Sequence, residues 1–314
     1  MRAFVFPGQG SQAVGMGKDL AENFPVAKEV FEQVNDALGQ DLSALMWDGP
    51  ESELTLTENA QPALMAVSIA VTRVLAERGY NLQDQAAYVA GHSLGEYSAL
   101  AAVGSIALDD AAKLLKLRGQ AMQRAVPIGV GAMAAVMGLD FEACVEIAQE
   151  ACQGSDVCQA ANDNAPGQVV LSGSISAVGR AIDLAKERGA KRAIDLPVSA
   201  PFHCALMQPA AEEMSEALAA TKISEPCVPL IANVSAELVT DPDMIRSLLV
   251  KQVTGRVRWR ESMTFLANKG VTHLIELGAG KVLSGLAKRN DDRLQGISLS
   301  SAESVLNFLD NKDK

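Results

Sequence analysis

A serine stands at the centre of Gly91-His92-Ser93-Leu94-Gly95, between a strand-like run over 86–90 and a helical run over 96–102. Glycine–any residue–serine–any residue–glycine between a strand and a helix is the pattern of a nucleophile elbow. So sharp a reversal brings two backbones together, which explains glycine at 91 and 95. The serine hydroxyl then lies near the positive end of a helix, where the Leu94 N–H can donate to an oxyanion. The motif predicts a nucleophilic serine.

A nucleophilic serine needs a base, and histidine is the usual one. The chain has three histidines. His92 adjoins the serine, and consecutive residues at a sharp turn point apart, while His273 lies in a strand-like run; we expect both to be structural. His203 lies in a loop just before a predicted helix, and such loops line clefts. We therefore predict that His203 is the general base.

An acid that would complete a catalytic triad is not evident. An esterase with this elbow would supply Asp or Glu between the serine and the histidine. The candidates fall mostly inside a segment that we assign below to an inserted subdomain: Asp140, Asp156, Asp163, Asp183 and Asp195.

Arg118 is unusual because it lies in the apolar stripe of a predicted helix over 109–125. A guanidinium that points inward must meet an anion. Two interpretations of Arg118 remain open. It could form a structural ion pair with a buried acid, or it could bind a substrate carboxylate through two hydrogen bonds.

The loop over 6–13 also has two possible uses. Gly8, Gly10 and Ala13 after a strand fit a relaxed dinucleotide fingerprint. That fingerprint needs an acid on a second strand about 20 residues later, where the sequence looks helical. The other use is delivery of a second backbone N–H to the oxyanion.

Composition narrows the class of protein. The 314 residues are 48% hydrophobic but only 4% aromatic, which suits a helix-rich α/β protein. The sequence has no apolar run long enough to span a membrane and no recognisable signal peptide, so we expect a cytoplasmic protein. A net charge of −11 argues against binding of nucleic acid or anionic membranes. The five cysteines lack the spacing of metal ligands.

The order of predicted elements indicates two domains. A breaker cluster over 127–131 is followed by strand, helix, strand, strand, helix and strand up to residue 196, the order of a ferredoxin-like unit. Strands and helices alternate before and after it. We expect an α/β fold: an α/β-hydrolase-like catalytic domain with a mostly parallel sheet over 1–126 plus 197–314, and a ferredoxin-like inserted subdomain over 127–196.

The predicted elements outside the inserted segment have the following bounds. Strands are expected over 3–6, 86–90, 228–233, 272–277 and 296–299. Helices are expected within 16–39 and over 62–78, 109–125, 205–220, 242–252, 259–269 and 281–289, with a last one at the end of the chain.

The motifs together resemble the acyltransferase family of fatty-acid and polyketide synthesis, which includes malonyl-CoA:acyl carrier protein transacylases. The resemblance covers essentially the whole chain. It rests on Pro7 to Gln12, Gly91 to Tyr97, Leu117 to Met122, Asn164 to Val170, His203, and Glu276 to Gly280.

The resemblance implies a role for each candidate residue. Ser93 would be the acylated nucleophile and His203 its base, in a ping-pong transfer of malonyl from malonyl-CoA to the phosphopantetheine thiol of acyl carrier protein. The N–H groups of Gln9 and Leu94 would form the oxyanion hole. Arg118 would bind the malonyl carboxylate, and the main-chain carbonyl of Gln252 would replace the triad acid. The resemblance implies no metal and no bound cofactor.

Two positions depart from the family pattern. Phe202 stands where stand-alone bacterial members usually carry a small residue, and it resembles malonyl-selecting polyketide domains. Arg256 stands where the family has proline, which would alter a surface loop rather than the chemistry.

An acidic carrier protein would be repelled by a chain of charge −11 unless it met a local basic patch. We favour a patch on the inserted subdomain, made of Lys186, Arg188, Lys191 and Arg192. A second basic group lies in the large domain: Arg256, Arg258, Arg260, Lys281, Lys288 and Arg289.

Two other functions compete with acyl transfer. A serine carboxylesterase or thioesterase would share the elbow but would need a triad acid and would have no use for Arg118. A nucleotide-binding domain built on Gly8 and Gly10 would leave Ser93 unexplained.

Overall fold

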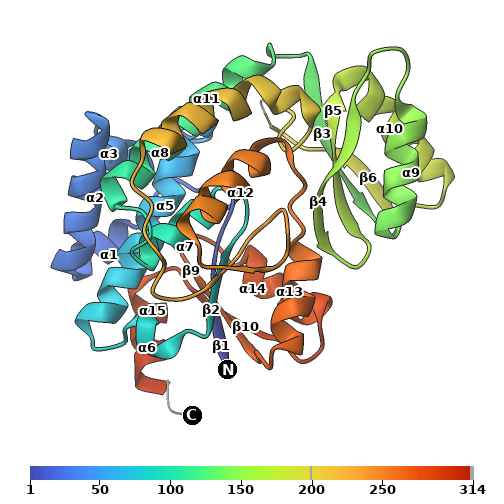
Figure 1. The fold of residues 1–314 in the computed structure, drawn as a ribbon. Coiled ribbons are helices and arrows are strands. Elements are labelled where there is room, and N and C mark those ends of the chain that lie inside the picture. Colours follow the sequence, from blue (N-terminus) through green and yellow to red (C-terminus); the bar gives the residue numbers. More distant parts are fainter. Residues whose placement is uncertain (199, 312–314) are drawn as a thin grey trace.

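The computed structural model describes residues 1–198 and 200–311 and contains two β-sheets (Figure 1). The larger sheet has the strand order β10-β9-β1-β2-β7-β8 and is parallel except for the pair β7 and β8. Its strands are β1 (Arg2–Phe6), β2 (Tyr88–Gly91), β7 (Leu230–Ile231), β8 (Leu238–Val239), β9 (His273–Leu277) and β10 (Gln295–Leu299).

Helices cover both faces of the larger sheet. The side chains of Ala3 to Phe6 in β1 are fully buried, as expected for a central parallel strand that is covered on both sides. Phe4 and Phe6 join a core cluster with helix α5 (Thr57–Glu77), whereas Ala3 and Val5 pack with α13 (Trp259–Asn268) on the opposite face.

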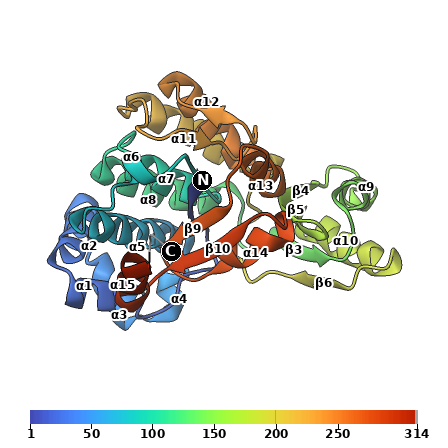
Figure 2. The same ribbon diagram turned by 90° about the horizontal axis from the view of Figure 1, so that it is seen from below.

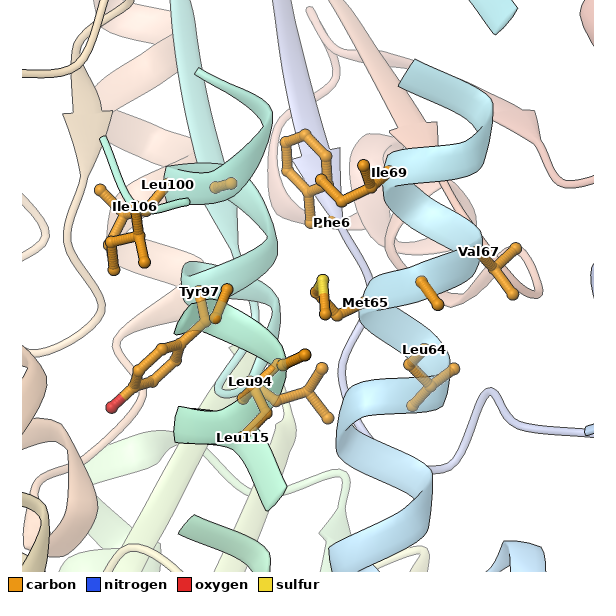
Figure 3. Close-up of a cluster of buried hydrophobic side chains, with 14 of the residues drawn as sticks. Phe6, Leu64, Met65, Val67, Ile69, Leu94, Tyr97, Leu100, Ile106 and Leu115 are labelled. Atoms are coloured by element: carbon orange, nitrogen blue, oxygen red, sulfur yellow. The ribbon is translucent and has the colours of Figure 1, made fainter. Parts of the chain in front are cut away.

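Helix α5 packs against the helix that follows the elbow, α7 (Gly95–Ala102), and against α8 (Leu108–Ala125). In Figure 3, Met65 of α5 points toward α7, which contains Tyr97 and begins directly after Leu94, and Leu115 of α8 lies below these residues. This packing fixes the first turn of α7, and with it the residues next to Ser93.

The remaining helices flank these elements. In the N-terminal part they are α1 (Lys18–Asn23), α2 (Pro25–Leu38), α3 (Leu42–Asp48), α4 (Glu51–Leu54) and α6 (Leu82–Gln85). In the C-terminal part they are the 3₁₀ turn η1 (Ala205–Met207), α11 (Gln208–Ala220), α12 (Pro242–Thr254), α14 (Val282–Asn290) and α15 (Ala302–Asn311). None of the described helices is long and apolar enough to cross a membrane.

The second sheet has four antiparallel strands in the order β4-β5-β3-β6. They are β3 (Gly131–Met137), β4 (Cys158–Ala165), β5 (Gln168–Ser174) and β6 (Arg192–Asp195), with α9 (Phe141–Ala151) and α10 (Ile175–Glu187) packed on one face. These elements share a hydrophobic cluster of their own. Figure 2 shows them to one side of the larger sheet.

Strand β4 joins the two parts of the molecule. Asn162 forms a β-bridge with Val257, whose N–H donates to the carbonyl of Ala161 at 2.8 Å. The buried carboxylate of Asp163 pairs with Arg260 at 2.8 Å. The second sheet is therefore held to the chain just after α12.

The element order agrees with the sequence prediction except for the short strand β8, which was not predicted, and for differences at several boundaries. The buried helix expected from Pro62 begins earlier, at Thr57, and the strand expected over 228–233 pairs only at Leu230–Ile231. The short helices α3, α4 and α6 were not predicted, because each is too short to show a periodic pattern.

Candidate active site

The structure forms the predicted elbow at the end of β2. Ser93 has a φ of 54°, in the left-handed region that side chains rarely adopt. A Cβ atom on Gly91 would lie 1.8 Å from the carbonyl oxygen of Gly95, and one on Gly95 would lie 2.2 Å from that of Phe6. Only glycine fits at either position, as the sequence analysis expected.

His203 lies beside the serine. Its Nε2 is 2.8 Å from Oγ of Ser93, and its Nδ1 is 2.8 Å from the carbonyl oxygen of Gln252 and 3.1 Å from that of Gly255. A carbonyl can only accept, so Nδ1 must carry the proton, which leaves Nε2 free to accept from the serine hydroxyl. Two neutral carbonyls thus occupy the place of a triad acid.

The charge state of His203 follows from its surroundings. The residue is 4% exposed. Burial, and then the nearby Arg118 cation, lower the pKa of His203 to about 3. The imidazole is therefore neutral in the free protein and can accept a proton.

The Arg118 guanidinium is buried and points at the serine. It donates to Oε1 of Gln61 at 2.7 Å, to Oε1 of Gln252 at 2.8 Å, and to Oγ of Ser93 at 3.1 Å. Its Nε has no hydrogen-bond partner among the described residues. The alternative of a direct ion pair with a buried acid is not realised in the described part of the chain, where Arg118 makes no salt bridge.

Glu96 is a buried acid that the sequence analysis missed. Its Oε2 accepts from Nε2 of Gln252 at 2.7 Å and from the N–H of Asn233 at 3.4 Å. Burial outweighs these contacts and the Arg118 charge, and it raises the pKa of Glu96 to about 7. An acid in the otherwise apolar first turns of α7 was the signal that could have revealed it.

Two further side chains were not identified from the sequence. Gln61 lies one residue before the apolar run that was expected as a helix over 62–78, and Asn233 lies in a loop after a two-residue strand. Both are buried. Neither belongs to a short motif, so the sequence carries no local signal for them.

The expected oxyanion donors lie at the ends of neighbouring strands. Gln9 follows β1 and Leu94 follows β2, and these two strands pair directly. Within residues 1–198 and 200–311, neither backbone N–H has a hydrogen-bond acceptor. A Cβ on Gly8 would lie 2.9 Å from the His92 carbonyl oxygen, so the two loops touch.

The other predicted residues are placed as follows. Phe202 is 8% exposed and precedes His203 in the same loop. His92 contacts Oδ1 of Asn164 at 2.8 Å and lies against the Trp259 ring, and His273 contacts Thr272. No cluster of three potential metal ligands occurs among the described residues.

The basic residues of the inserted segment differ in their surroundings. Arg188 pairs with Glu146 and Glu150, and Lys186 lies 3.6 Å from Asp183. Lys191 and Arg192 are exposed at the start of β6 and take part in no salt bridge within the described chain.

Comparison with known proteins gives a consistent result. The family model described as acyl transferase domain matches residues 3–296. A malonyl CoA-acyl carrier protein transacylase of Bacillus subtilis is 48% identical over 303 residues, covering 96% of this chain and 94% of that protein. The protein of the same name from Escherichia coli K12 is 47% identical over 303 residues, covering 96% of this chain and 97% of that protein.

The fold of the chain is also closely similar to solved structures. An acyl-carrier-protein-S-malonyltransferase from Bartonella henselae superposes with a TM-score of 0.97 at 52% identity, covering 100% of this chain and 99% of that one. A malonyl-transacylase in complex with a type II PKS acyl-carrier protein superposes with a TM-score of 0.95 at 44% identity, covering 99% of each chain.

Proposed function

The chain belongs to the acyl transferase domain family, and from this premise we propose that it transfers malonyl groups from malonyl-CoA to acyl carrier protein through an ester on Ser93. One observation carries the assignment of residues: the Ser93 hydroxyl lies within hydrogen-bond distance of both a neutral imidazole and a buried guanidinium. A base activates the nucleophile, and a fixed cation selects an acyl group that ends in a carboxylate.

In the first half-reaction, Nε2 of His203 takes the proton of the Ser93 hydroxyl as Oγ attacks the thioester carbonyl carbon. The N–H groups of Gln9 and Leu94 donate to the carbonyl oxygen as it becomes negative. The C–S bond then breaks, and His203 returns the proton to the departing CoA thiolate.

The second half-reaction reverses these roles. The phosphopantetheine thiol of the carrier protein gives its proton to Nε2 of His203, and its sulfur attacks the ester carbonyl carbon. The C–O bond to Ser93 breaks, and His203 protonates the serine. The thioester supplies the leaving group, so the chemistry needs no resident cofactor.

Arg118 would recognise the free carboxylate of the malonyl group. Its guanidinium is held by Gln61 and Gln252, which are neutral, so its charge is not cancelled by a direct partner. A malonyl ester on Ser93 has its carboxylate two carbons from the ester oxygen, within reach of a group that already lies 3.1 Å from that oxygen.

The two carbonyls behind His203 suit this substrate. The Gln252 and Gly255 carbonyls fix the imidazole tautomer without adding a negative charge beside an anionic acyl group. A carboxylate in the same place would repel the malonyl carboxylate.

We also infer the division into domains. The order β4-β5-β3-β6 with two helices on one face is typical of a ferredoxin-like unit, which supports residues 127–196 as an inserted subdomain. The hydrophobic cluster that runs from Ala134 to Ala193 supports the same division. The remainder, 1–126 plus 197–314, is then an α/β-hydrolase-like catalytic domain.

Carrier protein would dock on the basic patch Lys186, Arg188, Lys191 and Arg192. Since Arg188 already pairs with two glutamates, Lys191 and Arg192 would provide most of the attraction. A charge of −11 on the whole chain makes such a local patch necessary.

Incubation with malonyl-CoA labelled in the malonyl group, with and without carrier protein, tests the function. A transferase retains the label covalently and passes it to carrier protein. An esterase or thioesterase releases labelled malonate, and a nucleotide-binding protein never becomes labelled.

A further inference from the structure

Ser93 is held through its backbone by two side-chain amides that come from distant parts of the chain. Its N–H donates to Oδ1 of Asn233 at 2.8 Å, and its carbonyl oxygen accepts from Nε2 of Gln252 at 2.8 Å. Ser93 has a φ of 54°, which costs free energy and persists only where the surroundings enforce it. These two amides are the contacts that can enforce it from outside the elbow.

The Asn233 amide spans the turn. Its Nδ2 donates to the carbonyl oxygen of Gly91 at 2.6 Å while its Oδ1 accepts from Ser93. Because the Ser93 N–H can only donate and the Gly91 carbonyl can only accept, the partners fix which end of the amide is which. One side chain therefore ties together the two sides of the strand–helix reversal.

Asn233 is itself immobilised. It is 2% exposed, its N–H donates to Glu96, and its carbonyl accepts from the N–H of Arg258 at 2.9 Å. Among the described residues it makes no hydrogen bond to Oγ of Ser93, to His203 or to Arg118, so it does not touch the reacting atoms.

The hydrogen bonds that hold the Ser93 backbone also affect the oxyanion hole. The Ser93 carbonyl and the Leu94 N–H belong to one planar peptide group and point in opposite directions. Holding Ser93 on its N–H side and its carbonyl side therefore sets where the Leu94 N–H points. A misplaced donor or hydroxyl weakens transition-state binding far more than substrate binding.

We propose that Asn233 is a positioning residue, whose side-chain amide holds the Ser93 backbone so that Oγ and the Leu94 N–H are aligned for attack. This inference rests on the proposed function of Ser93. It assigns a role to a residue that the transfer chemistry described above does not use.

Asn233→Ala removes both hydrogen bonds, and Asn233→Asp keeps the size and an acceptor for Ser93 but cannot donate to Gly91. Ser235→Ala, two residues away in the same loop, is the matched control. We expect the acylation rate with malonyl-CoA to fall about 10–100-fold in Asn233→Ala, and less in Asn233→Asp. Malonyl-CoA affinity, measured by calorimetry in a Ser93→Ala background, should change less than two-fold.

A small alkyl boronic acid, which forms a tetrahedral adduct on serine, gives the second readout. Its inhibition constant should rise with the loss of acylation rate in Asn233→Ala and stay unchanged in Ser235→Ala. An unchanged acylation rate, or a loss confined to malonyl-CoA affinity, would overturn the proposal. If Asn233→Ala does not fold, as judged by circular dichroism, Asn233→Asp carries the same test. Absence of malonyl transfer by the wild-type protein, with the boronic acid effect intact, would contradict the proposed function alone.

Discussion

The guanidinium of Arg118 lies 3.1 Å from the Ser93 hydroxyl oxygen and helps keep the pKa of His203 low. A malonyl carboxylate that pairs with this guanidinium would offset its positive field. The imidazole would then become a stronger base when an acyl group with a carboxylate is bound. Under the proposed roles of Arg118 and His203, recognition of the substrate and activation of the nucleophile would thus be coupled through one cation.

Arg118→Ala should lower kcat/KM for malonyl-CoA by about 100-fold, because it removes about 3 kcal/mol of charge-assisted hydrogen bonding. Activity with acetyl-CoA should rise relative to malonyl-CoA, since the site no longer requires an anion. Arg124→Ala, on the same helix but at the surface, is the control. An equal fall with both substrates would show that Arg118 is structural only.

Glu96→Gln should change the pH dependence of stability. Burial raises the pKa of Glu96 from 4.5 to about 7, so its contribution to folding is fully present below pH 4.5 and is lost as the pH rises to 7. The variant should therefore gain stability over the wild type progressively between pH 4.5 and 7. Urea midpoints at several pH values measure this, and a pH-independent difference would refute the assignment.

How far the sequence predicts this protein depends on how local each signal is. The elbow at Ser93 and the inward-facing Arg118 could be predicted, because a tight turn and the apolar stripe of a helix each depend only on residues close together in the sequence. Gln61, Glu96 and Asn233 were not, because their roles arise only when segments far apart in the chain meet. The Gln252 carbonyl was expected only from the family resemblance, since every residue has a carbonyl.

Phe202 precedes His203 and is almost fully buried, so it should narrow the pocket beside the imidazole. Phe202→Ser should raise the ratio of kcat/KM for methylmalonyl-CoA to kcat/KM for malonyl-CoA. The expected change corresponds to about 1–3 kcal/mol of transition-state free energy, the range for one methyl group in a pocket. Competition between the two donors gives the ratio directly. If the ratio stays the same, the ring does not face the acyl group.

Reversing Lys191 and Arg192 to Glu should slow transfer to carrier protein, more at low than at high salt, because the attraction is electrostatic. Acylation by malonyl-CoA should be nearly unchanged. The matched variant reverses Lys281 and Lys288, in the second basic group. Should only that variant slow transfer, the docking surface lies on the large domain instead.

The central claim is that Ser93 carries the malonyl group between the two thiols. Mass spectrometry of the protein, quenched shortly after mixing with malonyl-CoA, tests it most directly. We predict one malonyl group on the peptide that contains Ser93, its removal by carrier protein, none in Ser93→Ala, and formation at least about 100-fold slower in His203→Ala. Malonyl on another residue, or transfer without any covalent intermediate, would contradict the account.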